Sequence, residues 1–141
     1  MFGHPLHPAV VHFPVALLLS ASAADLALLA GLTGDVHIGS VLMAGGLVMG
    51  LVAMGAGLLD FTKLEAAVVP HAVRHMTVMG LAWLGYAIAL YLRRDVLSGG
   101  ATIGSASIAL SLASALLLSV GGWLGGRLVY TFGAGVSKTR P

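Results

Sequence analysis

Five of the six histidines in this chain lie at the same end of its apolar segments. They stand in two short motifs, HPLHPAVVHFP near the start and PHAVRH in the middle, as His4, His7, His12, His71 and His75. Imidazole is the commonest metal-binding side chain, and titratable groups at the edge of a membrane span usually mark a functional site. The cluster therefore predicts a site that holds either a haem or a bare metal ion.

Haem b and a bare ion place different demands on these residues. Haem needs two axial ligands, an apolar slot and cations beside its propionates. We expect His12 and His75 as the axial ligands and Arg74 and Arg127 near the propionates. Copper or zinc instead needs three or four imidazoles at about 2.1 Å from one ion, which the five histidines together could supply. A third interpretation is a structural subunit whose histidines contact only lipid headgroups or a partner chain.

The composition indicates a membrane protein. The chain has 141 residues, of which 58% are hydrophobic and 9% charged, whereas soluble domains carry about 25% charged residues. It has no cysteine, which excludes thiolate zinc sites, iron–sulfur ligation and covalent haem attachment within the chain. The net charge of +2 comes from scattered residues, so we expect no nucleic-acid partner. No nucleophile–base set or nucleotide-binding loop is present, and we expect no enzymatic activity from the isolated chain.

Four apolar stretches are long enough to cross a membrane as helices, at residues 14–32, 38–59, 76–92 and 102–125. Short polar connections between them make neighbouring helices antiparallel. The sequence therefore predicts an all-α, up-down four-helix bundle in the membrane. We treat residues 1–141 as one membrane domain with a short polar tail at 132–141.

Basic residues are unequally divided between the two ends of this predicted bundle. The end that holds both termini carries Lys63, Arg74, Arg127, Lys138 and Arg140. The opposite end carries only Arg93 and Arg94. Because lysine and arginine are enriched in cytoplasmic loops, this asymmetry predicts that both termini are cytoplasmic.

Two further features lie inside the predicted spans. Asp25 in the first span would cost about 2.5–3.5 kcal/mol unpaired, so we expect it to face the bundle, protonated and hydrogen-bonded near Tyr86 and one of Ser107 or Ser111. A structural role is the main interpretation and a proton relay the alternative. Gly46 and Gly50 form a GxxxG motif, which predicts close helix packing within the chain or, alternatively, a homodimer contact.

The two halves of the sequence resemble each other at their histidine ends. AVVHF at residues 9–13 aligns with AVRHM at 72–76, and each is followed by a predicted span. A duplicated two-helix unit keeps its orientation, so its copies would be related by an axis along the membrane normal. His12 and His75 would then face each other across that axis, as a six-coordinate haem iron requires.

The opening HPLHPAVVHFPVALLLSASAADLALL resembles the start of the bacterial membrane proteins called the domain of unknown function 2231 family. GLLDF at 57–61, Arg74-His75 and GGRLVYTFGAGV at 125–136 agree with it. The resemblance implies a multi-pass protein of the bacterial cytoplasmic membrane. Some members resemble parts of redox chains, being fused to Rieske-type or cytochrome c-like domains. That association implies electron transfer with a redox partner protein or a quinone, among membrane lipids.

Overall fold

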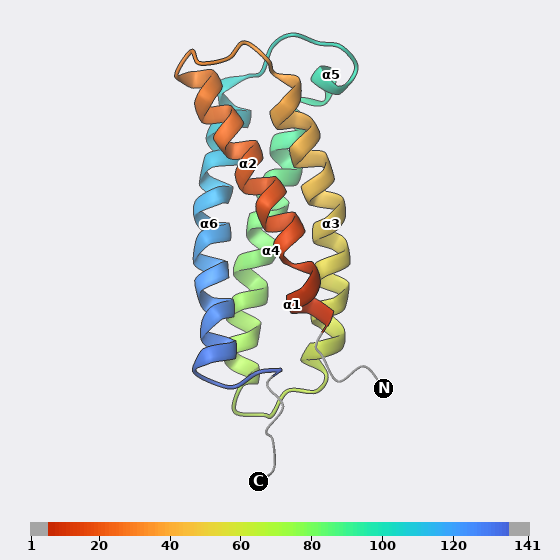
Figure 1. Ribbon diagram of the computed structural model, residues 1–141, viewed down its shortest axis with the longest axis vertical. Coiled ribbons are helices and arrows are strands. Elements are labelled where there is room, and N and C mark those ends of the chain that lie inside the picture. The colour runs from red at the N-terminus through yellow and green to blue at the C-terminus, as the bar shows by residue number, and fades with distance from the viewer. Residues whose placement is uncertain (1–5, 136–141) are drawn as a thin grey trace.

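The computed structural model describes residues 6–135 as an all-helical bundle in which no strand occurs. Four long helices run up and down in turn: α2 (His12–Leu29), α3 (His37–Phe61), α4 (Val69–Leu92) and α6 (Ser105–Tyr130) (Figure 1). Two short helices, α1 (Leu6–Val10) and α5 (Arg94–Leu97), precede α2 and follow α4. All four long helices have the length and hydropathy of membrane spans. The predicted fold class is confirmed.

The helix ends differ from the predicted spans for local reasons. α4 begins seven residues before residue 76, because Pro70 occupies its first turn, where the missing N–H costs no hydrogen bond. This start places both His71 and His75 on the helix. The short helix α1 precedes α2, and Pro14 lies in the first turn of α2.

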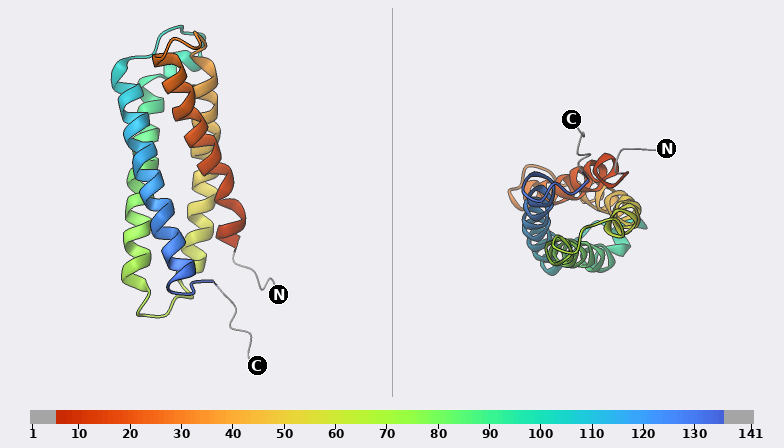
Figure 2. Two further views of the ribbon diagram at one scale, coloured as in Figure 1. Left: turned by 60° about the vertical axis from the view of Figure 1, so that its left-hand side comes forward. Right: turned by 90° about the horizontal axis from the view of Figure 1, so that it is seen from below.

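The bundle is built from two helical hairpins. α2 packs along α3 and α4 packs along α6, while contacts of α2 with α6 and of α3 with α4 join the hairpins. Seen along the bundle, the four long helices form a ring (Figure 2). The apolar core comprises Leu18, Ala21, Met43, Leu47, Ala82, Tyr86, Ala89 and Leu118. Large apolar side chains such as Phe13, Leu51 and Leu116 remain exposed on the outside, as expected of a surface that faces lipid.

The GxxxG motif of α3 is used inside this chain. A methyl group at Gly46 would lie 2.7 Å from the Cγ and Cδ2 atoms of Leu18 on α2. A methyl group at Gly50 would lie 2.8 Å from Cδ1 of Trp83 on α4. Trp83 also donates from Nε1 to the carbonyl of Leu47 at 3.0 Å. The two glycines therefore let α3 approach both of its neighbours closely.

We expect Gly46→Ala to lower the free energy of unfolding by about 1–3 kcal/mol, because the added methyl group overpacks the contact with Leu18. Gly55→Ala on the same helix is the matched control, since nothing lies within 4 Å of its added methyl group. There alanine should be neutral or stabilising, because it favours the helix by up to about 1 kcal/mol. Unfolding in mixed detergent micelles would measure both. Equal effects of the two substitutions would contradict the packing argument.

Candidate functional site

Two histidines meet at the end of the bundle that holds the chain termini. The ring centroids of His7 on α1 and His75 on α4 are 6.4 Å apart, and the rings are inclined at 77°. Nδ1 of His7 is 2.8 Å from the carbonyl oxygen of Ala53 on α3. Nδ1 of His75 is 2.9 Å from the carbonyl oxygen of Gly121 on α6. Because a carbonyl oxygen can only accept, Nδ1 carries a proton in both rings, and in the neutral form of each ring Nε2 holds the lone pair that a metal can bind.

The second nitrogen of each ring is available to a ligand. Within residues 6–135, Nε2 of neither His7 nor His75 forms a hydrogen bond. Gly57 and Gly125 provide room for the rings, since a methyl group at either would lie 3.0–3.2 Å from a ring atom. Each ring is therefore held at Nδ1, and its Nε2 forms no hydrogen bond with the described residues.

The histidine pair follows an internal repeat of the structure. Each histidine bonds to a carbonyl 46 residues further along the chain, and each ring packs on a glycine of the opposite helix in its own hairpin. The spacing between the two histidines equals the 68 residues that separate the ion-paired residues Asp25 and Arg93. Equivalent positions of the two hairpins thus lie 68 residues apart.

This repeat pairs His75 with His7, whereas the sequence alignment paired it with His12. His12 lies five residues after His7 and is exposed on α2. Five residues of a helix rotate a side chain by about 140°, so positions 7 and 12 cannot face the same neighbour. The assignment of His12 and His75 as axial ligands stays a prediction, but the ring that lies beside His75 is that of His7.

The other predicted site residues that the structure describes lie at the same end of the bundle. His71 stacks on Phe132 with ring centroids 4.1 Å apart. With Arg74, Leu124 and Arg127, these two residues line a cavity of about 140 Å³ between α4 and α6. Neither His7 nor His75 lines it, and the propionate role of the two arginines stays a prediction.

The sixth histidine, His37, begins α3 at the opposite end, and His4 lies outside the described residues. Among residues 6–135, no group of three or more histidine or acidic side chains is arranged to hold a bare metal ion.

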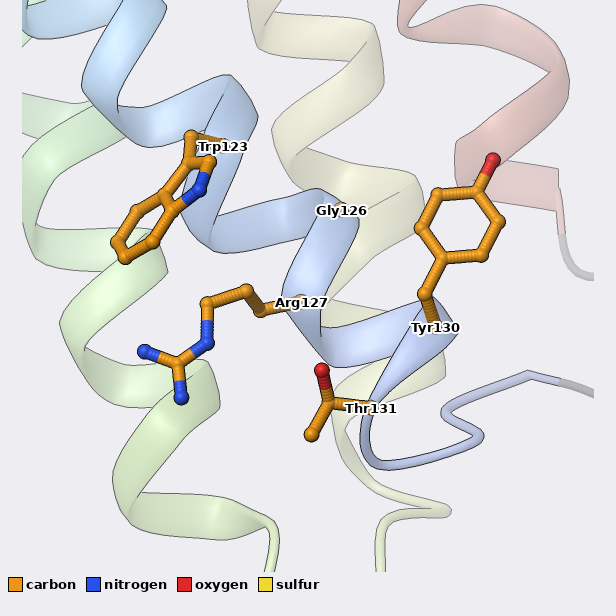
Figure 3. Close-up of a pocket in the computed structure, with 5 residues that line it drawn as sticks. All are labelled: Trp123, Gly126, Arg127, Tyr130 and Thr131. Carbon is orange, nitrogen blue, oxygen red and sulfur yellow. The ribbon is translucent and has the colours of Figure 1, made fainter.

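A second cavity adjoins Arg127 on α6. It measures about 280 Å³ and is lined by Trp123, Gly126, Arg127, Tyr130 and Thr131 (Figure 3). The guanidinium of Arg127 lies 5.2 Å from the centre of the Trp123 ring. Figure 3 shows these two side chains on one side of the helix and Tyr130 on the other. Tryptophan and tyrosine at the end of a span are typical of the membrane–water interface.

Asp25 has a different partner from the one the sequence predicted. Its carboxylate oxygens accept from Nη1 and Nη2 of Arg93 at 2.7 and 2.9 Å, and each residue is only 1% exposed. Arg93 also donates from Nε to Ser107 Oγ at 2.7 Å, and Ser107 donates to the carbonyl of Ala89 at 2.7 Å. In place of the predicted hydrogen bond near Tyr86, Asp25 makes the two-pronged contact that is typical of a carboxylate–guanidinium ion pair.

The predicted polar partners of Asp25 form a neighbouring network instead. Ser22 Oγ hydrogen-bonds with Tyr86 Oη at 2.8 Å and with Ser111 Oγ at 2.9 Å. Ser107 alone joins the ion pair, through Arg93. Sequence reasoning missed Arg93 because it was counted with Arg94 as a surface cation. The sequence did contain an indication of this pair, since Asp25 near the end of the first span and Arg93 at the end of the third span lie at the same end of the bundle.

Comparison with known proteins identifies the chain at family level. The model of the family described as "Predicted membrane protein (DUF2231)" matches residues 3–138. The chain belongs to the DUF2231 family. No curated protein and no solved structure matches the sequence or the fold. The family establishes a membrane protein, in agreement with the four membrane-length helices.

Proposed function

We propose that this DUF2231 protein binds haem b and takes part in electron transfer in the membrane, with His7 and His75 as axial ligands. The observation that carries the proposal is the pair of imidazoles from opposite hairpins, each with Nδ1 hydrogen-bonded and with Nε2 unbonded among the described residues. When bound, haem would supply a one-electron redox couple. A redox partner protein or a quinone would exchange electrons with it.

The two rings lie close enough to serve one bound group: their centroids are 6.4 Å apart, and they come from opposite hairpins. Both would hold the group through Nε2, because Nδ1 of each ring is engaged by a backbone carbonyl. A hydrogen bond from Nδ1 to a backbone carbonyl is also the usual way in which a protein orients a metal-binding histidine.

The number of imidazoles favours haem over a bare ion. A porphyrin provides four nitrogen ligands, so the protein has to add only two. A zinc ion would need at least three protein ligands. The structure brings two rings together, while the ring of His71 stacks on Phe132 and His12 is exposed.

The absorption spectrum of the purified protein tests the proposal. Protein from haem-replete cells should show a Soret band that sharpens and shifts on reduction with dithionite, with about one iron per chain. A colourless preparation with stoichiometric copper or zinc would favour a bare-metal site. A preparation with neither porphyrin nor metal would favour a structural subunit, and either result would overturn the haem proposal.

We further propose that the histidine end faces the cytoplasm of a bacterial cell. Arg93 is buried inside the bundle, which leaves Arg94 as the exposed arginine of the opposite end, whereas Lys63, Arg74 and Arg127 are exposed at the histidine end. Cytoplasmic ends carry the excess of cations.

Introduced cysteines can test this orientation, because the chain has no cysteine of its own. Thr62 follows α3 at the histidine end, and Ser98 follows α5 at the other, and both are exposed. In cells whose outer membrane has been made permeable, a membrane-impermeant maleimide should label Ser98→Cys and leave Thr62→Cys unlabelled until the membrane is broken. The reverse labelling would show that the termini face outward.

A further inference from the structure

We propose that the cavity of His71, Arg74 and Arg127 between α4 and α6 binds the phosphate of an anionic phospholipid. The cavity of about 140 Å³ joins these three side chains to two apolar ones, Leu124 and Phe132. Arginine and histidine donors at a small cavity select an oxyanion, and the planar guanidinium matches two phosphate oxygens at once. This proposal does not rest on haem binding.

The charges around the cavity are unbalanced. The ion pairs within residues 6–135 join Lys63 to Asp60, Arg93 to Asp25 and Arg94 to Asp95. Neither Arg74 nor Arg127 takes part in one. Two cations that line one small cavity repel each other, and a bound phosphate would remove that repulsion.

The surroundings of the cavity favour a lipid over free phosphate. Arg74 lies in the second turn of α4 and Arg127 in the last turn of α6, so the cavity is at the level where a span leaves the membrane. The guanidinium of Arg127 lies over the ring of Trp123 in a cation–π contact. Trp123 is 61% exposed, as is typical of a tryptophan at the membrane–water interface. The apolar side chains between the helices offer a surface along which acyl chains can lie.

Stacking keeps two of the site's side chains in place without a bound ligand. His71 lies against Phe132 with ring centroids 4.1 Å apart, and Arg127 lies against Trp123 at 5.2 Å. Aromatic contacts of this kind limit the rotamers of the donors and leave their N–H groups free. The site is therefore partly formed before a headgroup arrives.

Native mass spectrometry of the full chain can count and identify bound lipids. The protein would be released from micelles that contain equal amounts of phosphatidylglycerol and phosphatidylcholine. We expect a preference for one phosphatidylglycerol, which falls about fivefold for each of Arg74→Gln and Arg127→Gln. Arg94→Gln is the matched control, since it removes the same charge from the opposite end of the bundle, and it should leave the preference unchanged.

Two further measurements test whether the planar guanidinium matters and whether the ligand is a lipid or free phosphate. Arg127→Lys keeps the charge but loses the planar donor pair, and we expect it to lower the preference less than Arg127→Gln does. Excess inorganic phosphate should displace the lipid poorly, and efficient displacement would indicate a free-phosphate site. The proposal is overturned if wild type has no preference, if the Arg74 and Arg127 variants keep it, or if they lose haem and not the lipid, because the arginines would then serve the propionates.

Discussion

Arg93→Met is expected to lower the free energy of unfolding by about 3–5 kcal/mol, the largest stability effect that we expect in this chain. Both members of the Asp25–Arg93 pair are 1% exposed, and both guanidinium Nη atoms reach the carboxylate. Removing Arg93 would leave the carboxylate of Asp25 buried without a counter-charge, and would also remove the donor that Ser107 accepts from. Equilibrium unfolding by SDS in mixed micelles would measure the loss.

Two comparisons make the ion-pair experiment specific. Arg94→Met is the matched control, because Arg94 is exposed and its contacts, with Tyr91 and with Asp95 at 3.9 Å, lie on the surface. It should change stability by less than about 0.5 kcal/mol. The double variant Asp25→Leu/Arg93→Met should recover most of the loss, because apolar residues can replace a buried ion pair at little cost. If Arg93→Met unfolds like Arg94→Met, the pair does not stabilise the bundle.

The second large effect concerns the cofactor. Under the haem proposal, His7→Ala and His75→Ala should each abolish the spectrum of low-spin, six-coordinate haem, because either change leaves one axial position without its ligand. His37→Ala should have no effect, since His37 begins α3 at the opposite end, about 30 Å away. The Soret and α bands of the reduced proteins, with haem content per chain, would provide the measurement.

His12→Ala is the decisive control in that series. His12 is exposed on α2, and we expect its replacement to leave the haem spectrum unchanged. Loss of low-spin haem in His12→Ala, with an unchanged spectrum in His7→Ala, would instead support the pairing that the sequence alignment predicted. A graded loss of bound metal across His4, His7, His12, His71 and His75 would point to a single polydentate site for a bare ion.

The repeat gives the two ends of the bundle related architectures. Along α4, His75 and Arg93 are separated by 18 residues, or about 27 Å of helix. The equivalent residues of the first hairpin are His7 and Asp25. His7 lies beside His75, and Asp25 pairs with Arg93. Ser107, which supports Arg93, corresponds to Gly39, where a methyl group would lie 3.2 Å from Asp25 Oδ1. One end thus joins the hairpins through an ion pair, while the other presents two imidazoles.

Much of the architecture was predictable from the sequence, because membrane insertion depends on local properties. Runs of about 20 apolar residues with short polar connections determined the number, order and antiparallel course of the helices. The GxxxG motif indicated where helices approach closely, and Gly46 and Gly50 do so. These features need only the composition and spacing of neighbouring residues.

The identity of the contacting pairs was decided by the tertiary structure. Whether His7 or His12 lies beside His75 depends on the rotation of the first helices about their axes, which differs by about 140° between the two positions. Whether Asp25 meets Tyr86 or Arg93 depends on the vertical register of two helices that are 68 residues apart in the chain. The packing of the other helices sets both quantities, because an almost uniformly apolar helix carries little information of its own about which face turns inward.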